Sequence, residues 1–138
     1  MARNLMIPVS FGELVDKITI LEIKAQTFQG AALEHVTHEL NVLRVIHQDH
    51  QAVSVDPVSN EVVSNDALWE RLRRVNRSLW QVEDALRDYE AKREFGRRFI
   101  ALARSVYLIN DRRAALKRQL TLNDGSGIVE EKSYGTLA

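Results

Sequence analysis

The sequence predicts an all-α protein, a four-helix antiparallel bundle with long coiled-coil-like helices and a short C-terminal tail. Apolar residues recur at intervals of three and four positions in four segments, which is the periodicity of amphipathic helices. Only one short stretch alternates as a strand would. The 138 residues are enough to bury one hydrophobic core without cross-links. We therefore expect residues 1–138 to form a single helical domain.

The first helix is expected to run from Phe11 to about Phe28. Ser10 can cap its N-terminus, and Glu13 three residues later completes a capping box. Gly30 is a natural stop at the C-terminal end.

This first helix has two apolar sides. Its main face comprises Phe11, Leu14, Val15, Ile18, Leu21, Ala25 and Phe28. A second, narrower strip comprises Ile20, Ile23 and Thr27, together with Asp16. A helix that is apolar on two sides is either central in a bundle or shared with another subunit.

The next two helices flank a segment rich in breakers. The second helix is expected from Ala32 to about Asp49. Residues 52–65 hold a proline and several serines and asparagines among valines, so they form either a small hairpin or a mobile loop. Asp66, or Asn65 beside it, caps the third helix. The third helix carries a four-three repeat typical of coiled-coil packing, formed by Leu68, Leu72, Val75, Leu79, Val82, Leu86 and Tyr89.

The fourth helix is expected to follow a tight turn or kink at Gly96 and to run from Arg97 to about Leu122, packed antiparallel to the third. Two glycines in Asn-Asp-Gly-Ser-Gly end it. The tail, residues 123–138, is too short to fold alone and either docks on the bundle or stays disordered.

Composition excludes several classes of function. The chain has no cysteine, so disulfides, thiolate nucleophiles and cysteine-bound zinc are excluded. Nineteen basic residues balance nineteen acidic ones, so any site for a polyanion has to be local. No run approaches the roughly 20 apolar residues of a membrane-spanning helix. We expect a cytoplasmic protein without a cofactor, and neither a membrane nor nucleic acid is an expected partner.

Four polar residues lie in faces that should be apolar, and they form the candidate ligand site: Glu22, Asn110, Arg113 and Lys117. An isolated buried charge costs several kcal/mol, so such groups are normally paired. We expect Glu22 to pair with Arg113 or Lys117. Residues of the third helix that could join this network are Arg73, Asn76, Trp80, Glu83 and Arg87.

Two interpretations of these polar residues compete. In the first, they form a buried network that fixes the register of the helices. In the second, they line a cavity for an anionic small molecule, where Arg113 and Lys117 clamp the anion, Asn110 orients it and Glu22 acts as acid or base. No motif of a known reaction is present, so catalytic residues stay unassigned.

The histidines are expected to be structural or exposed. His35 and His38, and again His47 and His50, are three residues apart on the second helix. One helix supplies only half of a metal ligand set. We therefore predict no metal site, and we expect His47, in the apolar stripe, to be buried.

Four blocks in the chain carry a family resemblance: "PVSFGELVDKITILEIKAQ", "LWQVEDALRDYEAKREFGRRF", "NDRRAALKRQL" and "VEEKSY". Together they resemble a bacterial family of short helical proteins whose domain has no assigned function. The resemblance covers nearly the whole chain except residues 52–65 and implies a small helical protein without naming catalytic residues. The inward cations are also similar to those of the helical chorismate mutases, which bind a dicarboxylate inside a dimeric bundle. That family's first helix supplies an arginine, whereas this one has only Lys17 and Lys24.

Two hypotheses about function follow. The first is a cytoplasmic interaction or scaffold protein that forms a homodimer through a surface on the first and third helices. The alternative is a small enzyme or binding protein for an anionic metabolite, with Glu22, Asn110, Arg113 and Lys117 in its pocket.

Overall fold

Four helices make up the computed structural model of the chain, which describes residues 3–53 and 64–135. They are α1 (Phe11–Thr27), α2 (Gly30–Val53), α3 (Asn65–Lys92) and α4 (Arg97–Asp124). No strand occurs within these two described ranges, so the all-α prediction is confirmed. The hairpin or loop expected at residues 52–65 falls mostly on residues 54–63, which lie outside the described residues.

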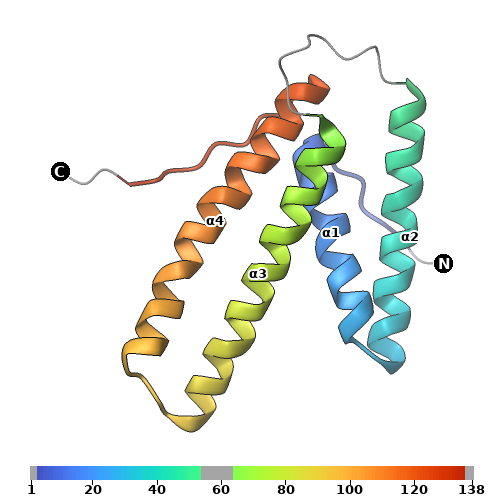
Figure 1. Cartoon of the computed structure of the whole chain (residues 1–138). Helices are drawn as coiled ribbons and strands as arrows, with labels where there is room; N and C mark the ends of the chain where they lie inside the picture. The colour runs from blue at the N-terminus through green and yellow to red at the C-terminus, as the bar shows by residue number, and fades with distance from the viewer. Residues whose placement is uncertain (1–2, 54–63, 136–138) are drawn as a thin grey trace.

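The first helix is the central element. α1 packs against α2, α3 and α4, whereas the backbone of α2 lies beside α1 only. Figure 1 shows α1 between α2 and the α3–α4 pair, with α4 returning alongside α3. Neighbours within the same chain therefore cover most of the main face of α1 and Ile23 of the second strip, whereas Ile20 of that strip is only half-buried.

The N-terminus of α1 is capped as expected, but only by one half of the capping box. Ser10 Oγ accepts a hydrogen bond from the backbone N–H of Glu13 at 3.2 Å. The carboxylate of Glu13 binds Lys117 at 2.7 Å, so it does not serve the helix end. α1 ends at Thr27, and Gly30, with φ +63°, opens α2 instead of stopping α1.

Two apolar clusters form the core, one on each side of α1. The first joins α1 to α3 and α4 through Phe11, Val15, Leu68, Leu72 and Leu120. The second joins α1 to α2 through Leu14, Ile18, Leu21, Val36 and Leu40. Trp69 packs against both clusters, so it links the two halves of the core.

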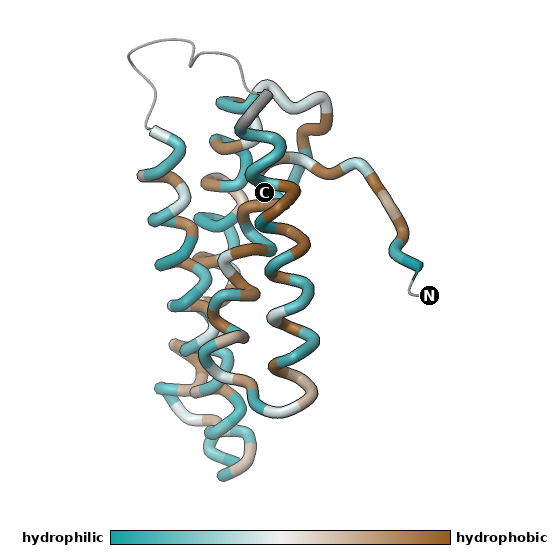
Figure 2. The backbone as a smooth tube through the Cα atoms, turned by 90° about the vertical axis from the view of Figure 1, so that its right-hand side faces the viewer, coloured by the Kyte–Doolittle hydropathy of each residue, from teal (hydrophilic) through white to brown (hydrophobic). Residues whose placement is uncertain are grey.

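Outside the core, the N-terminal segment is apolar and exposed. Leu5, Met6 and Ile7 are each more than 70 % exposed. Figure 2 shows this segment projecting away from the helices.

The hairpin of α3 and α4 starts and turns at residues that differ slightly from those expected. Ser64 caps α3 by accepting from the N–H of Ala67 at 3.2 Å, where Asp66 or Asn65 was predicted. Arg93 caps its C-terminus with a left-handed φ of 54°. The predicted turn at Gly96 is confirmed, since this residue is the N-cap of α4.

The α3–α4 hairpin extends beyond α1. Both its helices have 28 residues and α1 has 17. The seam residues Leu68 and Leu72 are 1 % and 0 % exposed, because α1 covers them. Further along the same seam, Leu79 and the residues after it are only half-buried. We call residues 79–109 the hairpin arm. The apolar seam between α3 and α4 continues along it, but no third helix covers that seam in the described structure.

The C-terminal tail docks on the bundle. Glu130 accepts a hydrogen bond from the Ser10 hydroxyl at 2.5 Å. Glu131 pairs with Arg118 at 2.7 Å, and Lys132 pairs with Asp111 at 2.8 Å. The tail therefore lies along α4 and reaches the start of α1.

Among the helices of the described ranges, none combines the length and the apolar character needed to cross a membrane.

The close contact between α1 and α4 depends on Gly12. A Cβ at this position would overlap the carbonyl oxygen of Lys117 and approach Thr121 Oγ1 to 2.7 Å. The bare backbone instead lets the N–H of Gly12 donate to Thr121 Oγ1 at 2.9 Å.

We predict that Gly12→Ala destabilises the protein by about 2 to 3 kcal/mol, because the added methyl forces α1 and α4 apart. Urea unfolding followed by circular dichroism measures the change. Gly127→Ala is the control, since nothing lies within 4 Å of a Cβ there. At an ordinary position inside a helix, replacing glycine by alanine increases the stability of the protein by about 0.5 to 1 kcal/mol. If Gly12→Ala is stabilising in the same way, α1 and α4 do not approach each other closely at Gly12.

Candidate functional site

Asp16 is the centre of a polar network between α1, α3 and α4. Its side chain is 1 % exposed. Arg113 of α4 binds both of its carboxylate oxygens, through Nε to Oδ1 at 2.9 Å and through Nη2 to Oδ2 at 2.5 Å. Asn76 of α3 donates its amide N–H to Oδ1 at 2.9 Å. One carboxylate therefore ties three helices together.

Thr19 completes the network on the α3 side. Asn76 Nδ2 also donates to Thr19 Oγ1 at 2.8 Å, and the Thr19 hydroxyl donates to the backbone carbonyl of Asp16 at 2.8 Å. Thr19 and Asn76 are both buried. Buried polar groups are costly unless they are hydrogen-bonded, and each of these three side chains has a partner.

Asp16 is held in its ionised form. Burial alone would raise its pKa, but the hydrogen bonds from Arg113 and Asn76 and the charges of Arg113 and Lys117 outweigh this, so the pKa lies below its ordinary value of 3.8. The hydrogen bonds that Arg113 donates to Asp16 raise the pKa of Arg113 despite its partial burial. The pair is an internal salt bridge at every pH near neutrality.

The structure corrects the partner predicted for Glu22. Its carboxylate binds Arg73 Nε of α3 at 3.0 Å, and Arg73 also binds Glu70 at 2.5 Å. Arg113 binds Asp16 instead. Lys117 binds Glu13 at 2.7 Å and lies 3.8 Å from Asp16. The expected pairing of Glu22 with Arg113 or Lys117 is therefore wrong.

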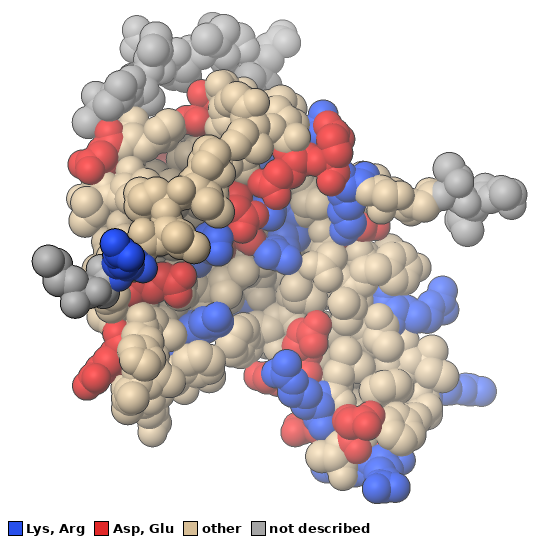
Figure 3. All heavy atoms as spheres, turned by 180° about the vertical axis from the view of Figure 1, so that it is seen from behind, with Lys and Arg blue, Asp and Glu red and all other residues tan. Residues whose placement is uncertain are grey.

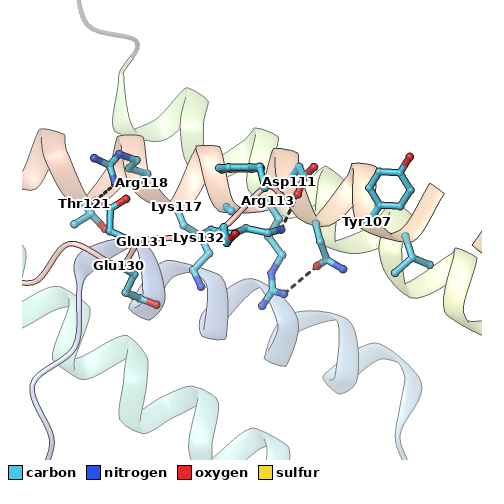
Figure 4. Close-up of a pocket in the computed structure, with 14 residues that line it drawn as sticks. Tyr107, Asp111, Arg113, Lys117, Arg118, Thr121, Glu130, Glu131 and Lys132 are labelled. Carbon is cyan, nitrogen blue, oxygen red and sulfur yellow. Dashed lines mark hydrogen bonds and ion pairs between the residues drawn. The ribbon is translucent and has the colours of Figure 1, made fainter. Parts of the chain in front are cut away.

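Three of the four candidate residues nevertheless share one groove. A cavity of about 600 Å³ lies between α4 and the C-terminal tail, and it includes Asn110, Arg113 and Lys117 but not Glu22. Figure 4 shows Arg113 and Lys117 pointing from α4 toward α1, and Asn110 accepts from Arg113 Nη1 at 3.4 Å. The tail forms the opposite wall through Glu130, Glu131, Lys132, Ser133 and Tyr134. We call this cavity the tail groove.

The cations of the tail groove are already neutralised by carboxylates. Arg113 and Lys117 face Asp16 and Glu13. Arg118 faces Glu131, while Lys132 of the tail faces Asp111. An anion entering the groove has to compete with these internal partners.

A second cavity, of about 500 Å³, lies between the C-terminal half of α1 and the hairpin arm. We call it the α1–arm cleft. Its walls are mainly apolar, formed by Ile20, Ile23, Phe28, Leu79 and Trp80. Glu83, Asp84 and Arg87 stand on its α3 side. Figure 3 shows the molecule hollowed between the lower end of the α1–α2 pair and the arm.

The histidines do not gather into a metal site. His35 and His38 are exposed. His47 was expected to be buried, and it is half-buried, with its ring centroid 4.7 Å from that of Trp69. Burial lowers the pKa of His47 below its ordinary value of 6.5, and the charge of His50 lowers it further. His50 binds Asp124 at 2.6 Å. No group of three or more potential ligands occurs in the described part of the chain.

Sequence reasoning identified the cations of the network and missed their acids. Of the α3 residues that could join it, Asn76 binds Asp16 within the network, whereas Arg73 binds Glu22 in a separate ion pair. Trp80, Glu83 and Arg87 line the α1–arm cleft instead. Asp16 was placed in the second strip of α1 but not assigned a partner, although its position beside Ile20 and Ile23 marked the side that faces α3 and α4. Glu13 was assigned to capping, which concealed its pairing with Lys117.

We predict that Asp16→Asn costs about 3 kcal/mol of stability at neutral pH, because Arg113 is left in the interior without its counter-charge. The pKa of Asp16 is lowered on folding, so its contribution is complete above pH 4 and is lost as the pH falls through the folded-state pKa. The difference in the free energy of unfolding between wild type and Asp16→Asn, measured with urea, should therefore be smaller at pH 3 than at pH 7.

Glu131→Gln provides the control for this experiment. It also removes a carboxylate from an arginine, but Glu131 is 75 % exposed, so the loss should stay within about 1 kcal/mol. A gap between wild type and Asp16→Asn that widens at pH 3 contradicts the assignment.

Comparison with known proteins adds a family. Curated proteins give no match, and neither do solved structures. One family model, described as a family of unknown function, matches residues 5–138. That range contains all four helices, the polar network and the tail groove. The chain therefore belongs to the family of unknown function DUF6165.

Proposed function

We propose that this protein is a helical interaction protein that acts as a homodimer, with the α1–arm cleft as its docking surface. The half-buried seam of the hairpin arm carries the proposal. The seam is closed by α1 at Leu68 and Leu72 but open from Leu79 onward. A pair of helices leaves one side of its seam open, and a second pair can close it as in a four-helix bundle. The proposal retains the cytoplasmic location expected from the sequence.

The cleft supports this proposal by its composition. Ile20, Leu79 and Trp80 line it and are each only half-buried. The cleft is formed by α1 and α3, the two helices on which the sequence placed the oligomeric surface. Apolar clefts with a charged rim are typical of sites that bind another protein.

The rim favours a second copy of the same chain as the partner. Glu83 and Asp84 lie within one helical turn of Arg87, so both signs occur together. Arg87 is 77 % exposed, and its contact with Asp84 is long, at 3.9 Å. In a two-fold interface the same patch meets itself, so Arg87 of each copy can face the acidic pair of the other.

We predict that Ile20→Glu converts the dimer into a monomer. Two carboxylates would be buried in the interface without partners, which raises the dissociation constant at least about a hundredfold, or about 2.7 kcal/mol. Light scattering at tens of micromolar should give the mass of two chains for the wild type and of one for the variant.

Ile46→Glu is the matched control, because Ile46 is an exposed isoleucine on α2, away from the cleft. It should remain dimeric, and circular dichroism should show that both variants keep their helices. A monomeric wild type at these concentrations contradicts the proposal.

A second candidate function is the binding of a small anionic metabolite in the tail groove. Its volume of about 600 Å³ falls in the range of small-molecule sites. The groove contains Asn110, Arg113 and Lys117, as the alternative hypothesis requires, but Glu22 lies elsewhere, so an acid or base role for Glu22 in this groove has no support.

Thermal-shift screening against a metabolite set tests this second function. A ligand at about 100 times its dissociation constant adds roughly 2.7 kcal/mol of stability. Asn110→Leu should remove the shift, because it deletes the amide while breaking only the 3.4 Å contact with Arg113. A metabolite that raises the melting temperature of Asn110→Leu as much as that of the wild type binds outside the tail groove.

A further inference from the structure

The free end of the hairpin concentrates unpaired positive charge. We call residues 92–99 the hairpin tip. Its four cations are Lys92, Arg93, Arg97 and Arg98, and all are exposed. None of the ion pairs within the described ranges involves these four, whereas Arg73, Arg74 and Arg87 of α3 are each paired with an acid. Glu94 is the one acidic residue of the tip.

Two of these cations stand where they weaken the helix. Arg97 and Arg98 begin α4, whose first turn contains no acidic residue. The N-terminus of a helix carries partial positive charge, so cations are unfavourable there and acids are favoured. The N-cap, Gly96, supplies no side-chain hydrogen bond that could offset this. The sequence at this helix start therefore opposes helix stability.

The backbone of the tip is also unusual. Arg93 has φ 54° and is the only non-glycine residue with positive φ in the described part of the chain. Glycine or asparagine normally occupies such a C-terminal position, because a side chain there adds strain. The tip keeps an exposed arginine at that position.

An aromatic pair lies among the cations. Phe95 is 50 % exposed, and its ring meets that of Phe99 edge to face, with centroids 5.1 Å apart. Unpaired charge, an unfavourable helix start, a strained arginine and an exposed phenylalanine thus occur within eight residues. Features that locally destabilise a fold tend to cluster at segments that bind a partner.

We propose that the hairpin tip binds the surface of an anionic phospholipid membrane. The cations meet the lipid headgroups, and Phe95 enters the interface, which accepts apolar rings beside basic residues. This binding is peripheral and goes beyond the proposed dimer. The zero net charge of the chain, which argued against a membrane partner, conceals this local cluster.

The position of the tip makes the attraction effective. The arm places residues 100–109 of α4, or about 15 Å, between the tip and the level at which α4 meets α1. This is nearly twice the Debye length of about 8 Å at physiological salt, so salt weakens the repulsion between the acidic residues of the body and the surface. Figure 1 shows the turn between α3 and α4 standing clear of α1 and α2, so it can approach a flat surface without contact from the other helices.

Vesicle sedimentation tests the proposal. The full-length protein should sediment with vesicles that contain about 30 mol % phosphatidylglycerol but not with pure phosphatidylcholine, and raised salt should release it. The double variant Arg97→Glu, Arg98→Glu should bind at least about tenfold more weakly. Its melting temperature should not fall, since acids suit the start of a helix.

Arg71→Glu, Arg77→Glu is the matched control. Both residues are exposed arginines of α3 without an ion pair in the described structure, so net charge changes equally. This control should keep vesicle binding, whereas Phe95→Ser should weaken it while all charges remain. The proposal is overturned if the wild type ignores anionic vesicles, if the control loses as much binding as the tip variant, or if only single-stranded RNA is bound.

Discussion

The arrangement of the helices depends on one buried carboxylate. Asp16 accepts hydrogen bonds from α3 through Asn76 and from α4 through Arg113, and its side chain is almost completely enclosed. A buried ion pair contributes little net stability compared with apolar packing, but it permits only one register, because any slip leaves a charge unpaired. Gly12, one turn earlier, lets α1 approach α4 closely enough for these bonds to form. Register and close approach thus support each other, and the two apolar clusters provide the bulk of the burial around them.

The helices were predictable because each carries its periodicity locally. The four segments, the Ser10 cap and the turn at Gly96 all follow from residues that lie close together in the sequence. The docking of the tail was left open, since its contacts join residues far apart in the chain, such as Ser10 and Glu130. Helix ends shifted by a few residues for the same reason: Gly30 can stop one helix or open the next, and only the packing of α2 decides.

The candidate site was predictable only in part. Arg113, Lys117 and Asn110 were recognisable as polar residues within an apolar stripe, and the structure places them in one groove. The acidic residues that pair with these cations could not be identified in the same way, because periodicity shows which side of α1 is buried but not which helix covers that side. α1 has three neighbours, and its broad main face is shared by all of them, with Glu22 on that face binding Arg73 of α3. Asp16 lies on the strip that faces α3 and α4, where the sequence indicated apolar contacts.

The ion pairs of α4 differ between its two ends in the described structure: Arg113, Lys117 and Arg118 are paired, whereas Arg97 and Arg98 are not. Where α1 covers the hairpin, acids and bases are matched within hydrogen-bonding distance, as between Glu13 and Lys117. Beyond α1 the seam of the arm is half-buried, and the tip holds cations without partners beside an exposed phenylalanine. Two polar atoms of the body, His47 Nε2 and Trp69 Nε1, are also buried without a hydrogen-bond partner within the described ranges, so it is the unpaired charges, and not all unpaired polar groups, that gather at the exposed hairpin tip.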